Sequence, residues 1–363
     1  MPALFTADPI NIVYATGARN MTVFSMMGAV RFLLVVCDGP TVLWEFGGSE
    51  HLPAALDTID EVRTAPGVTP LSGPGHLDAI DEFAAEIALV CAEHLGADMR
   101  LAVERVDHPV TDALRAGGFA LSSATDVFVA SRLIKLPDEV AIMRTAMRCV
   151  TEAVESMQCV IAHGMTEVEV WSEFHRHLIA EDGEYVATRL VQAGERTFPY
   201  FREAGRHRLV DGDLFCIDTD ATGPGGYGVD FSRTFVCGDR PMAPAHRSLH
   251  AMALDQLQHN ASLLAPGRTF EEFSRSCWEV PRRLAPFGYY CVAHGLGLSG
   301  EYPYIPAHDS STAFPLDGHF ESGMVICIES YIGDPNIGRG IKLEDQFLIT
   351  DDGAELLSTA PHL

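Results

Sequence analysis

Acidic side chains occur inside strand-like segments of the carboxyl-terminal half, where apolar residues are expected. The segment 214–235, LFCIDTDATGPGGYGVDFSRTF, predicts two β-strands joined by a Gly/Pro turn. Strand alternation places Cys216, Asp218 and Asp220 on one face, and an antiparallel return brings Asp230 beside them. Three ionised carboxylates in apolar surroundings are costly unless they are protonated, solvated or neutralised by a cation. The segment therefore predicts a metal site.

Three further residues suit the same site. His294 opens HGLGLSGEYP, Glu329 ends the apolar run 324–328, and Glu344 interrupts another strand-like segment. Five carboxylates and one imidazole against two divalent cations leave a local charge near minus one, which favours two ions over one. Oxygen ligands with a single histidine and no cysteine favour iron, manganese or cobalt, with zinc less suited. Each residue also has a simpler explanation: the acids could flank a turn, and the histidine could be a core residue. The order in which all of these residues occur, together with their strand setting, argues against the simpler explanations.

The residues before this region form an α/β unit. Strands are expected at 30–37 and 41–46 around a turn, a helix at 80–95, and further strands at 101–106 and 127–132. Residues 134–139 indicate a linker, because Pro137 ends one segment and Asp138 and Glu139 suit the first turn of the long helix that follows. The sequence thus predicts a separate amino-terminal domain.

The acidic strands follow a weak internal repeat. Residues 164–169 and 267–272 share the pattern G-x-T-x-x-E, in which the threonine caps a helix and the glutamate reaches back to it. Each follows a long helix. Two such units before acidic strands indicate a pseudo-twofold α/β domain.

The order Asp, Asp, His, Glu, Glu on such strands resembles the pita-bread family (creatinase/aminopeptidase P, peptidase M24). The likeness covers nearly the whole chain, since residues 11–17 resemble the start of the family's first domain and residues 134–139 its linker. It implies an α/β (α+β) fold with a creatinase-type domain at 1–133 and a pita-bread catalytic domain at 134–363. It also implies two divalent ions (Fe, Mn or Co) and five ligands: Asp218, Asp230, His294, Glu329 and Glu344.

Asp220 departs from most of the family, where a glycine lies two residues after the first aspartate. The extra acid and the longer turn are similar to the iron-dependent dimethylsulfoniopropionate lyase branch, which makes Asp220 a candidate sixth ligand. Tyr289 falls where that branch places an active-site tyrosine.

The proton-transfer residues differ from both relatives. Peptidases of the family use two further histidines, but residues 193–201 contain none, and the position seven residues after His294 is Glu301. The lyase branch uses an aspartate where this chain has Gly300. Glu301 is the nearest replacement base, and a solvent-facing loop glutamate is the equal alternative.

Aromatic residues hint at the substrate. Phe198, Tyr200 and Phe201 precede the first acidic strand, while Tyr289 and Tyr302 flank the His294 loop. They could hold a sulfonium or quaternary ammonium group by cation–π attraction, although core packing explains scattered aromatics as well. Two arginines, Arg233 and Arg339, could pair a substrate carboxylate.

Composition bounds the partners. The chain has 363 residues, 47% of them apolar, which suffices for two cores, and its net charge of −25 excludes a nucleic-acid partner. Nine scattered cysteines indicate buried thiols such as Cys37 rather than disulfides. The start MPALFTADP lacks a signal sequence, so we expect a cytoplasmic protein with no membrane segment.

These observations predict a homodimeric metal-dependent lyase or hydrolase. The preferred substrate is a small zwitterionic carboxylate, cleaved by dimethylsulfoniopropionate-lyase-like elimination or by hydrolysis. An Xaa-Pro aminopeptidase or dipeptidase acting on a short prolyl peptide is the alternative, and a metal-free creatinase-like or binding protein is the second.

Overall fold

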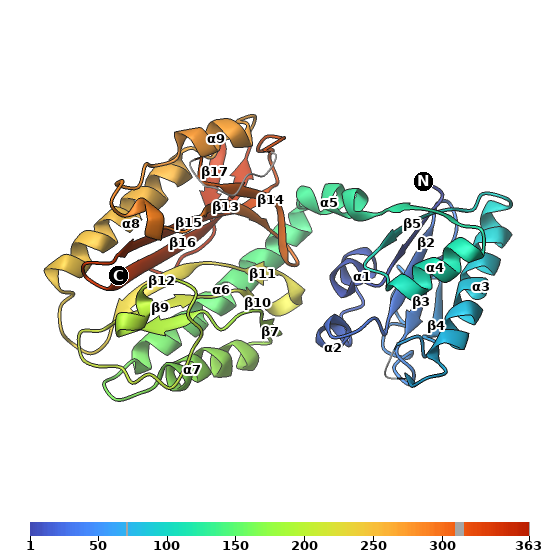
Figure 1. The fold of residues 1–363 in the computed structure, drawn as a ribbon, viewed down its shortest axis with the longest axis horizontal. Coiled ribbons are helices and arrows are strands. Elements are labelled where there is room, and N and C mark those ends of the chain that lie inside the picture. The colour runs from blue at the N-terminus through green and yellow to red at the C-terminus, as the bar shows by residue number, and fades with distance from the viewer. Residues whose placement is uncertain (70–71, 309–315, 363) are drawn as a thin grey trace. The chain divides into compact units, whose positions relative to one another are not determined.

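The computed structural model describes residues 1–69, 72–308 and 316–362. The chain divides into two compact units, Met1–Ser131 and Arg132–Leu363, so the division falls two residues before the predicted boundary. Helices and strands alternate in both units, as predicted for a mixed α/β protein (Figure 1).

The amino-terminal unit contains a six-stranded sheet in the order β4-β3-β2-β1-β5-β6. Phe5, Phe32, Trp44 and Phe83 pack against one another at ring-centroid distances between 4.9 and 6.4 Å, so aromatic side chains form the centre of its core. Its strands are β1 (Ala3–Thr6), β2 (Phe32–Val36), β3 (Thr41–Glu45), β4 (Glu61–Thr64), β5 (Arg100–Glu104) and β6 (Ala120–Ser123). Its helices are α1 (Pro9–Thr16), α2 (Thr22–Met26), α3 (His76–Leu95) and α4 (His108–Ala116), and α5 (Thr125–Leu133) begins within it.

The strand predicted at 127–132 is wrong, because these residues lie in α5. Val127 and Val129 favour a strand by propensity, but both are partly exposed and only Phe128 between them is buried. Within the described residues, the two valines do not pack in a sheet. Their preference for strand conformation therefore does not decide the structure of this segment.

The second unit carries an eight-stranded sheet in the order β14-β13-β15-β16-β12-β9-β8, with β17 paired to β16, and a three-stranded sheet β11-β10-β7. The strands are β7 (Tyr185–Val186), β8 (Val191–Ala193), β9 (Leu214–Asp218), β10 (Ala221–Thr222), β11 (Gly228–Val229), β12 (Ser232–Val236), β13 (Cys291–Leu296), β14 (Gly300–Pro306), β15 (Val325–Asp334), β16 (Arg339–Thr350) and β17 (Gly353–Leu356). The helices are α6 (Pro137–Val160), α7 (Glu167–Ala180), α8 (Pro244–Ser262) and α9 (Phe270–Ser276). Short 3-10 turns lie at Gly194–Thr197, Pro224–Gly226 and Ala285–Phe287.

Both predicted capping boxes are present. The Thr166 hydroxyl accepts from the Glu169 amide at the start of α7, and the Thr269 hydroxyl accepts from the Glu272 amide at the start of α9. In each box the glutamate carboxylate accepts from the backbone amide of the threonine. In Figure 1, α8 lies along β15 and β16, and α6 lies beside β10 and β11. The repeated helix pairs agree with a pseudo-twofold domain.

Strand register brings the acidic residues together. Glu329 of β15 lies opposite Glu344 of β16, and Ser232 of β12 lies opposite both Glu344 and Asp218. The predicted hairpin differs in detail, since the strand ends at Asp218 and Asp220 adopts a left-handed backbone with φ 37°. The chain therefore breaks the alternation between the two aspartates.

All nine cysteines are free thiols, as predicted, but Cys37 is exposed because it follows the end of β2 at a turn. Among the described residues, no helix has the length and apolar character needed to cross a bilayer.

Candidate metal centre

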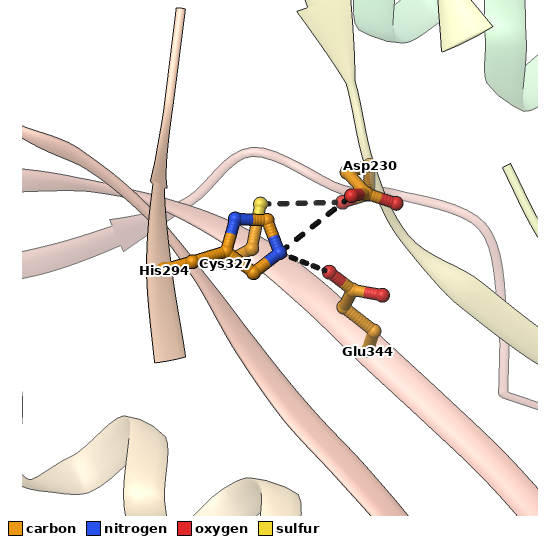
Figure 2. Close-up of side chains that lie close together, drawn as sticks. All are labelled: Asp230, His294, Cys327 and Glu344. Atoms are coloured by element: carbon orange, nitrogen blue, oxygen red, sulfur yellow. Dashed lines mark hydrogen bonds and ion pairs between the residues drawn. The ribbon is translucent and has the colours of Figure 1, made fainter. Parts of the chain in front are cut away.

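The imidazole of His294 lies among three carboxylates. Its Nε2 atom is 3.4 Å from Glu344 Oε1 and 3.6 Å from both Asp230 Oδ2 and Glu329 Oε1. Figure 2 shows Asp230 and Glu344 pointing toward the histidine from neighbouring strands, with the Cys327 thiol behind the ring. These side chains come from β13, β15, β16 and the segment after β11, so sheet register alone assembles one half of the predicted site.

A second group joins Asp218, Asp220 and Asp230, whose carboxylate oxygens lie within 4.8 Å of one another. Asp230 belongs to both groups. Thr188 Oγ1 donates to Asp220 Oδ2 at 2.5 Å, which fixes the carboxylate on the left-handed residue. The structure thus brings together all six residues that the sequence predicts as ligands.

Two hydroxyl groups orient Asp218, and no local pattern in the sequence indicated this role for either of them. The Tyr200 phenol donates to Asp218 Oδ2, and Ser232 Oγ donates to Asp218 Oδ1 at 2.6 Å. Tyr200 also stacks on Tyr331 with ring centroids 4.9 Å apart. Donors on both oxygens of a carboxylate leave it little freedom to rotate.

The chain also places an ammonium group in this cluster. Lys342 is fully buried on β16, two residues before Glu344, with its Nζ atom 2.6 Å from Glu329 Oε2 and 2.8 Å from Glu344 Oε2. Burial alone would lower the pKa of Lys342, but Asp218, Glu329 and Glu344 outweigh it and hold the pKa well above its usual value. A lysine at spacing i, i+2 from an acid within a strand was the available signal.

The carboxylates repel one another. Burial, followed by the charges of Glu344, Asp220 and Asp218, raises the pKa of Asp230 well above its usual value. Burial and the charge of Asp218 raise the pKa of Asp220 to about 7. Burial lowers the pKa of His294, but its bonds to Glu329 and Glu344 outweigh burial and raise it. Asp220 and Asp230 therefore favour their protonated forms unless a further cation lies beside them.

The donor set fits a divalent cation. Asp230 Oδ1 is buried and accepts no hydrogen bond from any described residue. Buried carboxylate oxygens without donors are costly, and a cation would satisfy them. Oxygen ligands with one imidazole suit manganese, iron or cobalt.

A cavity of about 640 Å³ opens onto the carboxylates. Asp218, Asp220, Asp230, His294 and Glu329 line it together with five aromatic residues: Tyr185, Phe201, Tyr289, Tyr302 and Tyr304. The Tyr289 ring lies 5.4 Å from Phe201, and its hydroxyl lies 3.1 Å from that of Tyr304. Three of the aromatics weighed in the sequence, Phe201, Tyr289 and Tyr302, therefore form part of the cavity wall.

Glu301 lines the cavity but is held by two cations. Its Oε1 atom is 2.7 Å from Arg132 Nη2, and its Oε2 atom is 2.7 Å from Lys135 Nζ, while only 7% of its side chain is exposed. A side chain at Gly297 would occupy the space of this carboxylate. Glu301 as a catalytic base stays a prediction, and a carboxylate with both oxygens paired does not favour it.

Neither arginine proposed for a substrate carboxylate lines the cavity. Arg233 is buried behind the sheet, where it donates to the Glu344 carbonyl at 2.7 Å, to Asp345 Oδ1 at 2.8 Å and to the Ala360 carbonyl at 2.6 Å. Ser358 Oγ donates to the same Asp345 oxygen at 2.6 Å. Arg233 therefore joins the carboxyl-terminal segment to the strand that carries Glu344.

Two buried cysteines, Cys216 and Cys327, lie near the acidic residues. Cys216 contacts Thr234 Oγ1 at 3.1 Å on the sheet, whereas Cys327 lies within the His294 group. His250 of α8 is also buried, with its Nε2 atom 3.3 Å from the His362 carbonyl.

The chain is similar to known proteins along nearly its whole length. The model of metallopeptidase family M24 matches residues 141–351. The dimethylsulfoniopropionate lyase DddP of Roseovarius nubinhibens is 34% identical over 362 residues, which are 98% of this chain and 81% of that protein. The Xaa-Pro dipeptidase of Pyrococcus furiosus is 28% identical over 237 residues, which are 64% of this chain and 65% of that protein. The solved prolidase of Pyrococcus furiosus superposes with a TM-score of 0.79 at 21% identity, covering 99% of this chain and 97% of that chain, which concerns the fold alone.

Proposed function

The chain belongs to metallopeptidase family M24, and from this membership we propose that it uses two divalent ions to cleave a small zwitterionic carboxylate, by elimination from a sulfonium acid. The predicted likeness to the pita-bread family and to its dimethylsulfoniopropionate lyases is confirmed. Family membership makes it a metal-dependent lyase or hydrolase. The number of ions, the substrate and the residue roles are part of the proposal.

Six residues would hold the ions: Asp218, Asp220, Asp230, His294, Glu329 and Glu344. Asp230 belongs to both halves of the cluster, so it is the best placed to be shared. Bound divalent ions would polarise a carboxylate oxygen of the substrate. Tyr200 and Ser232 would keep Asp218 in position through their hydrogen bonds.

The single observation that carries the choice of substrate is an aromatic wall facing the acidic cluster in one cavity. Phe201 and Tyr289 lie edge to face 5.4 Å apart, which presents a ring face that can attract a cationic group. His294 is the one histidine among the described residues that line the cavity. The cavity therefore offers cation binding and metal ligands, but no additional histidine for peptide cleavage.

The proposed elimination requires one proton transfer and one bond cleavage. A base removes a proton from the carbon next to the substrate carboxylate, and the released electron pair forms a carbon–carbon double bond. The bond between carbon and sulfur breaks, and a neutral sulfide leaves with its electrons. Glu301 can act as this base only after Arg132 and Lys135 release it.

The direct test is to assay the metal-loaded protein in parallel with dimethylsulfoniopropionate and with Xaa-Pro dipeptides. We expect release of volatile sulfide, measured by gas chromatography, together with an unsaturated acid. Cleavage of the dipeptides without sulfide release would support the peptidase alternative, which the similarity to a dipeptidase favours. A protein that neither takes up metal nor acts on either substrate would support the silent, binding-protein alternative.

Phe201 offers a sharper control. Replacing Phe201 by Leu removes the ring face but keeps an apolar side chain, whereas Phe201→Tyr keeps the ring. A cation–π contact at an exposed site is worth about 1 kcal/mol, so we expect the leucine variant to raise KM for the sulfonium acid roughly fivefold and the tyrosine variant to leave it unchanged. Equal KM values in both variants would contradict cation binding by this wall.

A further inference from the structure

Lys342 is buried at the centre of the acidic cluster. Its Nζ atom contacts Glu329 Oε2 at 2.6 Å, Glu344 Oε2 at 2.8 Å and Asp218 Oδ2 at 3.5 Å, and it also donates to Ser232 Oγ at 2.7 Å. Its side chain has no exposed area and does not line the cavity. A substrate in the cavity therefore cannot reach the ammonium group, and a substrate-binding or proton-donating role does not fit.

The two glutamates divide their oxygens between two directions. In both Glu329 and Glu344, Oε1 faces His294 and Oε2 faces Lys342. This arrangement follows from the register, because Lys342 and Glu344 share one face of β16 and Glu329 lies opposite Glu344 on β15. The oxygens on the histidine side are left for an external cation, while the chain itself supplies a cation on the other side.

We propose that Lys342 is a permanent counter-cation that holds Asp218, Glu329 and Glu344 in their ligand positions before any metal binds. The inference rests on the ligand set proposed above. In the metal-bound state, where a ligating imidazole is neutral, five carboxylates and one ammonium carry a net charge of −4, which two divalent ions would neutralise. Lys342 is a positioning residue in this arrangement, since it acts through the ligands and touches no substrate.

The consequence is a fold that does not depend on metal. With Lys342 present, the metal-free protein retains an ammonium group in contact with Asp218, Glu329 and Glu344. With an uncharged side chain at this position, the same acids face one another without a chain cation, and the folded state needs an external ion. Metal that binds only the folded state then raises the melting temperature Tm by a larger amount.

The experiment measures Tm by calorimetry with excess Mn²⁺ and after chelation with EDTA, and metal content by elemental analysis. We expect chelation to lower Tm of Lys342→Met at least about three times as much as Tm of the wild type. Lys342→Arg keeps the charge and should behave as the wild type. Lys135→Met is the matched control, because Lys135 is another buried, paired lysine of the same unit outside the ligand set, so its substitution should lower Tm equally with and without metal.

A double variant covers the case in which Lys342→Met does not fold. Lys342→Met combined with Glu329→Gln removes one carboxylate together with the ammonium, and it should regain most of the metal-free Tm. Equal chelation effects in wild type and Lys342→Met, or a double variant no more stable than the single one, would overturn the proposal. No measurement here uses a substrate, so a metal-binding protein that cleaves no sulfonium acid would refute the proposed function and leave this inference standing.

Discussion

Two groups of acids border the same cavity and differ in how the chain balances them. Glu301 is a single carboxylate held by Arg132 and Lys135, with each of its oxygens 2.7 Å from a cation. The cluster around His294 contains five carboxylates and one permanent cation, Lys342. Both groups are buried and both contain Glu, so neither burial nor residue type separates them. The excess of negative charge over the chain's own cations separates them, and it is this excess that favours a metal at the proposed site.

The amino-terminal unit contains a third case, which belongs with Glu301. Arg31 and Glu45 have no exposed side-chain area and lie 2.9 Å apart. One acid meets one base there, and nothing calls for an external ion. A balanced buried pair holds a fold together, whereas an unbalanced cluster requires a ligand.

The strongest way to break the unbalanced cluster is Asp230→Asn. Asp230 belongs to both halves of the cluster, so the variant removes a charged oxygen from each. Substituting a residue that only hydrogen-bonds a metal ligand typically lowers metal affinity or activity by about 10–100-fold. Because Asp230 is a proposed ligand itself, we expect activity to fall at least about 100-fold. Elemental analysis should also show a reduced metal content. Full metal content and full activity would exclude Asp230 from the ligand set.

Breaking the balanced group should change stability instead. Glu301→Gln leaves Arg132 and Lys135 buried without their anion, so we expect the free energy of unfolding to fall by about 3 kcal/mol, measured by chemical denaturation. Metal content should not change. A variant of normal stability that loses activity would instead restore Glu301 as the base.

Tyr200→Phe sharpens the comparison within the cluster. It removes the phenol that donates to Asp218 and keeps the ring, so we expect about a tenfold weaker Mn²⁺ affinity in a chelator competition. Tyr331→Phe is the control, because its hydroxyl donates to the Thr197 carbonyl at 2.7 Å rather than to a proposed ligand. Similar affinities in the two variants would show that the phenol of Tyr200 is dispensable.

The smallest change in the free energy of unfolding is expected for a solvent-exposed ion pair. Arg144 and Glu355 lie 2.6 Å apart with roughly half of each side chain exposed (45% and 43%). Arg144→Ala should lower the free energy of unfolding by less than about 1 kcal/mol, and added salt should reduce the difference further. A cost as large as that of Glu301→Gln would mean that burial is not what separates these pairs.

Local patterns in the sequence predicted much of this structure. The capping boxes at Thr166 and Thr269 and the start of α6 at Pro137 depend on residues three or four positions apart, so a short window contains the whole interaction. Acids inside apolar strands indicated a metal site, and the resemblance to the family supplied the ligand set, with His294 and Asp220 in it. α5 was missed because only tertiary contacts could decide between helix and strand for Val127 and Val129.

The sequence did not indicate which residues contact the predicted site residues. Glu301 was read as a free base because Arg132 and Lys135 lie more than 160 positions away in the chain and no local pattern joins them. Tyr200 likewise reaches Asp218 across a loop. Sequence spacing indicates which side chains share a face of one element, but pairing between distant elements requires the fold.

The bonds from Arg233 and Ser358 make the last residues of the chain a structural support of strand β16. Deleting residues from Ser358 onward would take away the hydroxyl that Asp345 accepts from and the Ala360 carbonyl that Arg233 donates to, directly beside Glu344. Truncated expression versions of this protein should therefore bind manganese poorly although every ligand is intact, and a purification tag is better attached at the amino terminus.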